Sequence, residues 1–249
     1  MSSLNPVDIF NDFRSGKIDK SFIIEFIKKE KSVDFLLELY QLLESHVSEE
    51  AKQLKLLMEE TLGKKFITKF KIVPQESMAL GLLEKTLGQE ILNDEEFPEF
   101  HHIHASYRVK NGHVTIIDIV ELCCPRVLFL KFFPHLIYLT ICMTNLKEIK
   151  GIEYLSKLEY LNLASNELTE ISGLENLFCL KKLDLNLNKI SELDFRSTMG
   201  KLEELFISFN PLNRLNGLKN LKNLKYIEIE DVNLQKTKIE RIMKRLNLN

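Results

Sequence analysis

Apolar positions in the second half of the chain repeat every 22 residues. With Leu158 taken as position 1 of a repeat, position 1 is occupied in six successive repeats by Val114, Leu136, Leu158, Leu180, Leu202 and Leu224. Positions 4, 6 and 11 are apolar or cysteine in the same six repeats, without a gap between residues 114 and 235. This spacing fits neither an amphipathic helix nor a half-buried strand. It predicts stacked coils, because one coil cannot bury its own apolar residues and neighbouring coils can.

Each coil is expected to hold a short strand at positions 3 to 5, with position 4 pointing inward, so that the strands of successive coils form a parallel sheet. Glycine at position 16 and apolar residues at positions 14 and 20 predict a short return on the opposite side, such as a 3₁₀ helix. Residues 193–201 depart from this pattern, because Phe195 stands where glycine is expected. We expect a differently shaped return there.

Asparagine recurs at position 9 of the three central coils, as Asn166, Asn188 and Asn210. A buried side-chain amide at a tight turn can bond backbone groups that the turn leaves unpaired. The three residues therefore predict a structural asparagine ladder. Thr144 and Val232 take the same place in the flanking coils, so the ladder should stop near the ends.

These positions give the pattern LxxLxLxxNxL, which resembles the leucine-rich repeat family. The repeat length is similar to that of the 22-residue intracellular class typified by the leucine-rich regulatory subunit of protein phosphatase-1. The resemblance implies a right-handed curved solenoid of the α/β class, with a parallel sheet on its concave face that binds proteins. No phosphatase-specific motif is present, so no phosphatase residue is carried over.

The chain outside the repeats predicts three further parts. Residues 1–65 form a small α-helical domain, with helices starting near Pro6, Ser21, Ser32 and Ser48 and the last one ending at Gly63. Residues 66–113 form a capping segment, made of a helix over 75–88 and a hairpin arm whose turn is Asn111-Gly112. The repeats occupy residues 114–235. Residues 236–249 form a capping helix with one basic face.

Composition and charge indicate a cytoplasmic protein. The chain is 45% hydrophobic and 28% charged, with a net charge of −2, which gives no bulk attraction to nucleic acid or anionic lipid. The N-terminus does not resemble a secretory signal, and no apolar stretch is long enough to span a membrane. The four cysteines form no C-x-x-C pair and are expected to be reduced thiols.

Candidate catalytic and metal-binding residues are weak. His101, His102 and His104, which His113 could join across a hairpin, fit no recognised zinc spacing. Cys142 has no histidine partner at a useful spacing. The common phosphate-binding, dinucleotide-binding and nucleophile-elbow motifs are missing from the sequence. We therefore expect no catalytic residue, no metal ligand, no cofactor and no small-molecule substrate.

The outward positions of the predicted sheet carry aromatic residues among charged ones. A sheet face in water needs no aromatic rings for folding, although such rings are also good strand residues. Aromatic rings surrounded by charge are typical of interface anchors. The residues predicted to bind a protein partner are Tyr138, Tyr160, Lys182, Asp184, Glu204, Phe206, Phe209, Tyr226 and Glu228.

The sequence therefore predicts a non-enzymatic scaffold that binds a partner protein on the concave face of the repeats. Two alternatives stay open. One is an enzyme or metal-dependent module in the N-terminal region, with the repeats recognising its substrate. The other is a nucleic-acid or membrane adaptor that uses the basic C-terminal helix.

Overall fold

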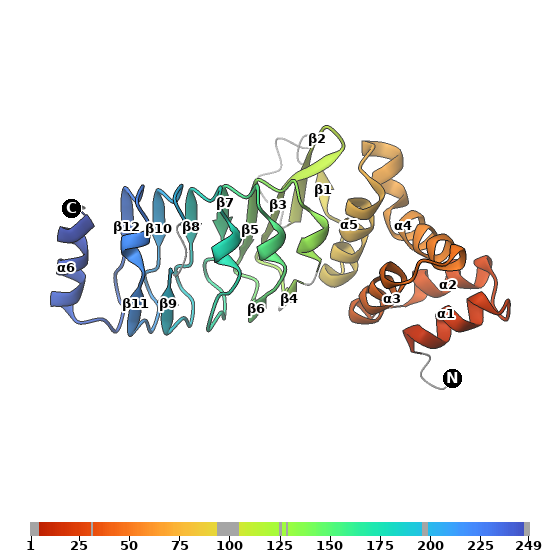
Figure 1. Cartoon of the computed structure of the whole chain (residues 1–249), viewed down its shortest axis with the longest axis horizontal. Coiled ribbons are helices and arrows are strands. Elements are labelled where there is room, and N and C mark those ends of the chain that lie inside the picture. Colours follow the sequence, from red (N-terminus) through yellow and green to blue (C-terminus); the bar gives the residue numbers. More distant parts are fainter. Residues whose placement is uncertain are drawn as a thin grey trace. The chain divides into compact units, whose positions relative to one another are not determined.

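The computed structural model describes residues 5–30, 32–93, 105–124, 126–127, 129–195 and 199–246. They fall into two compact units (Figure 1). The helical unit consists of residues 1–91 with the turn residues 111–113, and the repeat unit of residues 92–110 and 114–249. Residues 66–91, which the sequence suggested as part of a cap for the repeats, thus group with the helices.

The helical unit contains five helices, namely α1 (Pro6–Arg14), α2 (Lys20–Lys29), α3 (Val33–Ser45), α4 (Glu49–Phe70) and α5 (Pro74–Leu87). Their starts follow from side chains that accept hydrogen bonds from first-turn backbone N–H groups. Asn5 forms a capping box with Asp8 at the start of α1, and Ser32 caps α3. The expected start at Ser21 is wrong. Asp19 accepts the bond from the Phe22 N–H, so α2 begins at Lys20.

The helix expected to end at Gly63 continues to Phe70, so Gly63 is not a terminator. Its role is packing against α5. A Cβ atom on Gly63 would lie 2.6 Å from the Ser77 Cβ, and one on Gly81 would collide with the Leu62 carbonyl oxygen. The two glycines therefore let α4 and α5 approach closely, a reason for helical glycine that sequence period alone does not reveal.

Gly81→Ala is expected to lower the free energy of unfolding of the helical unit by about 2–3 kcal/mol, because the added methyl group has no room at the α4–α5 contact. In an unconstrained helix the same change would stabilise by about 1 kcal/mol. Urea unfolding followed by circular dichroism checks the sign. Gly200→Ala, where an added Cβ meets nothing within 4 Å, is the control. Stabilisation by Gly81→Ala would contradict the close contact.

The repeat unit is built on one eight-stranded sheet (Figure 1). Its strands, in spatial order, are β1 (Leu92–Asn93), β2 (Ala105–Lys110), β3 (His113–Val120), β5 (Tyr138–Cys142), β7 (Tyr160–Asn162), β8 (Lys182–Asp184), β10 (Glu204–Phe206) and β12 (Tyr226–Glu228). From β3 to β12 all pairs are parallel, and each residue lies opposite the one 22 positions away. The leucine at position 4 is buried in every central coil, as at Leu161, Leu183 and Leu205. The predicted repeat frame is confirmed.

The other side of each coil returns through short elements. These are the 3₁₀ helices at Leu130–Phe132, Ile152–Tyr154, Leu174–Asn176 and Leu218–Asn220, and the two-stranded sheets β4 (Arg126–Val127) with β6 (Glu148–Ile149) and β9 (Glu192–Asp194) with β11 (Arg214–Asn216). Three of the helices follow a glycine with positive φ, such as Gly173 at 83°. In the departing coil, Phe195 is buried in place of that glycine. Its next three residues lie outside the described part of the chain.

The last coil is followed by α6 (Lys236–Leu246). Ile239, Ile242 and Met243 are half-buried, whereas Arg241 and Lys244 are exposed. The apolar core of a repeat stack needs a cover at each end. Deleting residues 236–249 is therefore expected to expose the last coil and cause fraying or aggregation. Light scattering and thermal unfolding check this, and a soluble truncation that melts at the same temperature would show that α6 is not a cap.

Candidate functional site

The turn after each central strand is held by a buried asparagine. The Asn188 amide nitrogen donates to the carbonyl oxygens of Leu163, Leu185 and Asn186, at 2.9 to 3.2 Å. Its Oδ1 accepts the Leu168 N–H at 3.1 Å. Asn166 and Asn210 bond the equivalent groups one coil earlier and one coil later. These bonds link neighbouring coils and fix the edge at which the outward-facing strand residues end.

Aromatic side chains on the outward face of the sheet form two pairs. The rings of Tyr138 and Tyr160 stack with centroids 4.3 Å apart and planes 3° from parallel. The rings of Phe206 and Tyr226 lie 5.3 Å apart and are tilted by 45°. Both pairs join residues on neighbouring strands. Part of each ring is therefore used in cross-strand packing, and the rest faces solvent: Tyr226 is 47% exposed.

Charged side chains lie between and beside these pairs. The Lys182 ammonium is 3.0 Å from a Glu204 carboxylate oxygen and 4.6 Å from the centroid of the Phe206 ring. Burial raises the pKa of Asp184, and the nearby Glu228 carboxylate raises it further. The predicted residues of strands β8, β10 and β12 thus form one continuous polar and aromatic surface, rather than isolated side chains.

A second exposed row at the end of the strands was only partly recognised in the sequence. Position 8 has a left-handed backbone in all six coils, with φ between 47° and 57°, at Glu121, Met143, Ser165, Leu187, Phe209 and Asp231. Met143, Leu187 and Phe209 place large apolar side chains there, each about half exposed. Leu187 was missed. The signal that could have found it is its place in the repeat frame, directly before the ladder asparagine.

Other candidate residues have structural partners. His113 Nδ1 lies 2.8 Å from the buried Glu76 carboxylate within the helical unit. His101, His102 and His104 lie outside the described residues. Burial raises the pKa of the Cys142 thiol, and the carboxylates of Asp184 and Glu121 raise it further. The reactive thiolate form of Cys142 is therefore disfavoured.

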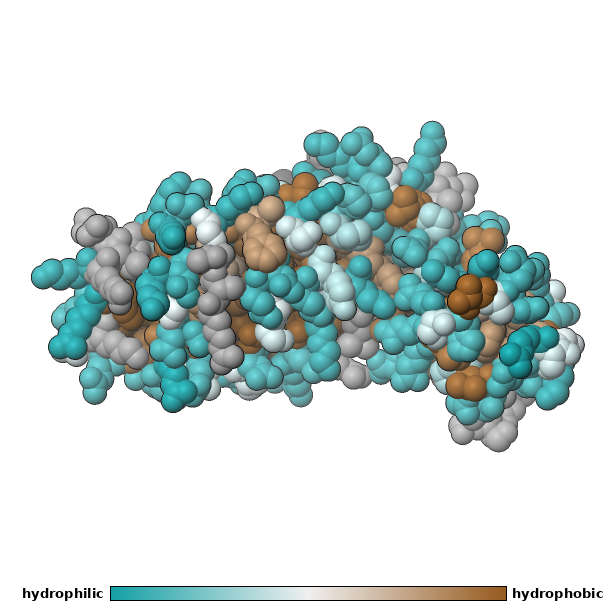
Figure 2. Space-filling view, viewed as in Figure 1, coloured by the Kyte–Doolittle hydropathy of each residue, from teal (hydrophilic) through white to brown (hydrophobic). Residues whose placement is uncertain are grey.

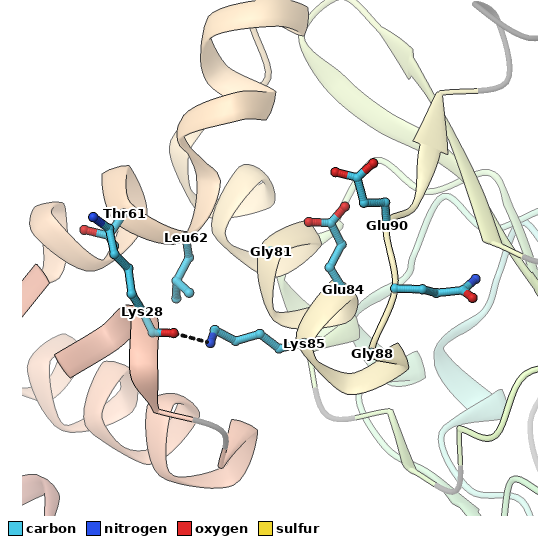
Figure 3. Close-up of a pocket in the computed structure, with 9 residues that line it drawn as sticks. Lys28, Thr61, Leu62, Gly81, Glu84, Lys85, Gly88 and Glu90 are labelled. Carbon is cyan, nitrogen blue, oxygen red and sulfur yellow. Dashed lines mark hydrogen bonds between the residues drawn. The ribbon is translucent and has the colours of Figure 1, made fainter. Parts of the chain in front are cut away.

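The helical unit contains a hollow of about 430 Å³ lined by α4, α5 and the end of α2 (Figure 3). Lys85 reaches across it and donates to the carbonyl oxygens of Lys28 and Glu30, at 3.4 and 2.9 Å. Burial lowers the pKa of this lysine. On the other side, the Glu84 carboxylate accepts the Ile91 N–H at 3.1 Å. Both charged side chains thus hold local backbone in place, and Lys85 satisfies carbonyls at the end of α2.

The rest of the surface gives less defined candidates. The face shown in Figure 2 is mainly hydrophilic, with small apolar patches between the charged side chains. Tyr154 and Phe178 are exposed on the returns, but single apolar residues on a surface are common. Among the described residues, no helix is both long enough and apolar enough to span a bilayer.

Comparison with known proteins gives matches among solved structures only. No protein-family model and no curated protein matches the chain. Internalin C2 of Listeria monocytogenes is 20% identical, with a TM-score of 0.49 over 53% of this chain and 57% of that one. The ectodomain of the receptor kinase SOBIR1 from Arabidopsis thaliana is 20% identical, with a TM-score of 0.48 over 66% and 97%. This chain thus spans little more than half of the internalin structure. Its own 22-residue coils, parallel sheet and buried asparagines make the chain a leucine-rich-repeat solenoid preceded by a helical unit.

Proposed function

We propose that this chain is a non-enzymatic scaffold that binds a protein partner on the concave face of its repeats. The observation that carries the proposal is the set of aromatic rings on the solvent side of the sheet, while the core of each coil is filled by the leucines on the other side. Partly exposed aromatic side chains surrounded by charge are typical interface anchors. The proposed contact residues are Tyr138, Tyr160, Lys182, Asp184, Glu204, Phe206, Phe209, Tyr226 and Glu228.

The position-8 row supports the same surface. Bulky side chains with a left-handed backbone cost about 1–3 kcal/mol each, and glycine or asparagine would avoid most of that cost. Leu187 and Phe209 remain about half exposed, so burial in the core does not offset it. Contact with a partner would bury these side chains and give their placement a purpose.

The similarity to the 22-residue intracellular class rests on repeat length and on the position-9 asparagines. A cytoplasmic location fits this class and the four free thiols, of which Cys124 is buried. We include both points in the proposal. The helical unit would then serve as a second contact or a tether to a larger complex.

Affinity capture compared between two forms of the full chain tests the proposal. The wild type and the variant Tyr160→Ala with Phe206→Ala are used as baits, and bound proteins are identified by mass spectrometry. We expect at least one protein to be captured by the wild type and lost by the variant. The control, Tyr154→Ala with Phe178→Ala, removes two exposed aromatic rings outside the sheet and should retain it. Equal capture by all three baits would contradict the proposal.

A further inference from the structure

The C-terminal part of the concave face combines aromatic rings with an excess of carboxylates. Strands β8, β10 and β12 and the residues that follow them carry one lysine against five acidic residues, namely Lys182 against Asp184, Glu204, Glu228, Glu230 and Asp231. The whole chain has a net charge of only −2. Negative charge is therefore concentrated on this part of the sheet.

At the centre of this surface, one aromatic ring lies between two carboxylates. Phe206 is opposite Asp184 on one neighbouring strand and opposite Glu228 on the other. Strands in a sheet are about 4.8 Å apart, so the three side chains share a single row. The ring of Tyr226 lies beside Phe206. A positively charged group over these rings would be within reach of both carboxylates.

Asn186 holds the two carboxylates in place. Its N–H donates to Asp184 Oδ1 at 3.0 Å, and its side-chain amide donates to Glu228 Oε1 at 2.9 Å. Its own Oδ1 accepts the Ser208 N–H at 2.7 Å, which anchors the amide to the next coil. The row is thus ordered in the free chain, and binding there would need little rearrangement.

These two carboxylates differ from others on the solenoid in having no cation of their own. Glu159 and Glu203 pair with Lys181 and Lys225 of the following coils, at 2.6 and 2.7 Å. Among the described residues, neither Asp184 nor Glu228 has an ion-pair partner. Mutual repulsion is one reason that the pKa of Asp184 is raised. A cation supplied from outside would relieve this repulsion.

The chain itself shows which chemistry the surface accepts. The Lys182 ammonium lies over the Phe206 ring and against the Glu204 carboxylate, so one lysine is already held by a ring and a carboxylate together. A basic side chain of a partner would meet the same kind of groups at Tyr226, Asp184 and Glu228. Charge complementarity thus selects a basic partner over a neutral or acidic one.

We propose that the concave surface around Phe206 binds a basic segment of the protein partner, with an arginine or lysine side chain lying on the Phe206 and Tyr226 rings between Asp184 and Glu228. This inference rests on the proposed function, since it specifies the partner for that same face. The guanidinium of arginine suits the row best, because it can stack on a ring while donating to two carboxylates.

Isosteric substitutions separate charge from structure at this row. Asp184→Asn with Glu228→Gln keeps the oxygen atoms that accept from Asn186 and removes both charges. The matched control is Glu153→Gln with Glu170→Gln, which removes two charges outside the large sheet. Lys182→Met removes the cation that competes for the surface and is expected to raise affinity for a basic peptide roughly threefold.

The experiment selects random short displayed peptides on the wild-type chain and measures each selected peptide against the variants. We expect enrichment of arginine and lysine. Asp184→Asn with Glu228→Gln should weaken binding at least about tenfold, and the control less than about twofold. Equal losses in the two double variants would overturn the inference, because general electrostatic attraction would then explain the binding.

The variant Tyr160→Ala with Phe206→Ala separates this inference from the proposed function. Peptides that this variant loses, but that are not enriched in basic residues, would overturn the basic partner and leave concave-face binding supported. Failure to recover any peptide that this variant loses would contradict both. A gain of affinity for neutral or acidic peptides in Asp184→Asn with Glu228→Gln would likewise count against a basic partner.

Discussion

Replacing Tyr160 and Phe206 together with alanine is expected to weaken binding of the protein partner at least about a hundredfold. Truncating a buried aromatic anchor typically costs about 2 kcal/mol or more, and 1.4 kcal/mol corresponds to a tenfold change in affinity. The two residues belong to different aromatic pairs, with the β8 coil between them. The double variant therefore removes one ring from each end of the proposed surface. Calorimetry with the captured partner measures the loss.

Folding should change much less than binding in this variant. Both side chains lie on the solvent side of the sheet, and their ring pairs are worth about 0.5–1.5 kcal/mol each. Tyr154→Ala with Phe178→Ala, which removes exposed rings outside the sheet, should leave affinity unchanged. A large drop in melting temperature for the Tyr160 and Phe206 variant would show instead that these rings are mainly structural.

Asn188→Ala is expected to destabilise the repeat unit by about 3 kcal/mol. The amide accepts one backbone N–H and donates to three carbonyl oxygens in two coils. Alanine would leave the buried Leu168 N–H without its partner, and each stranded buried polar group costs about 1–3 kcal/mol. The effect should spread to neighbouring coils, because repeat stability depends on the interfaces between coils. Chemical unfolding of the variant and the wild type gives the difference.

Asn233→Ala provides the comparison for the ladder. Asn233 is exposed and stands one residue outside the ladder register. Its replacement should change the free energy of unfolding by less than about 0.5 kcal/mol, as is usual for surface substitutions. If the two alanine variants were equally stable, the ladder would not hold the coils together.

The repeat frame was predictable because a solenoid repeats one local solution many times. The leucines at positions 1, 4 and 6 must point inward in every coil, so a 22-residue period reveals strand positions and register together. The 3₁₀ returns also follow, because a glycine with positive φ precedes three of them. Phe195 shows how the coil at residues 193–201 departs, since an aromatic side chain fills the space used elsewhere by a glycine turn.

The helical unit was predicted less well because its features depend on packing. Gly63 has the composition signal of a helix end, yet its function is to let α5 approach α4. Asp19 and Ser21 are both suitable N-caps by residue type, and only the backbone geometry at Asp19 decides between them.

The candidate surface could be placed from sequence but not its internal contacts. Outward positions follow from the repeat frame, so the aromatic and acidic residues could be assigned to one face. The contact of Lys182 with Phe206 and the bridge from Asn186 to Glu228 depend on rotamers. They could not be read from spacing, and neither could the left-handed backbone that exposes Leu187.

Amide hydrogen exchange of the full chain with and without its captured partner tests the central claim most directly. Binding on the concave face predicts slower exchange in the backbone between residues 160 and 231, at the strands β7, β8, β10 and β12 and the position-8 turns that follow them. The returns that carry Tyr154 and Phe178 should exchange as in the free chain. Protection confined to residues 5–91, with the strands unchanged, would contradict the claim and assign partner binding to the helical unit.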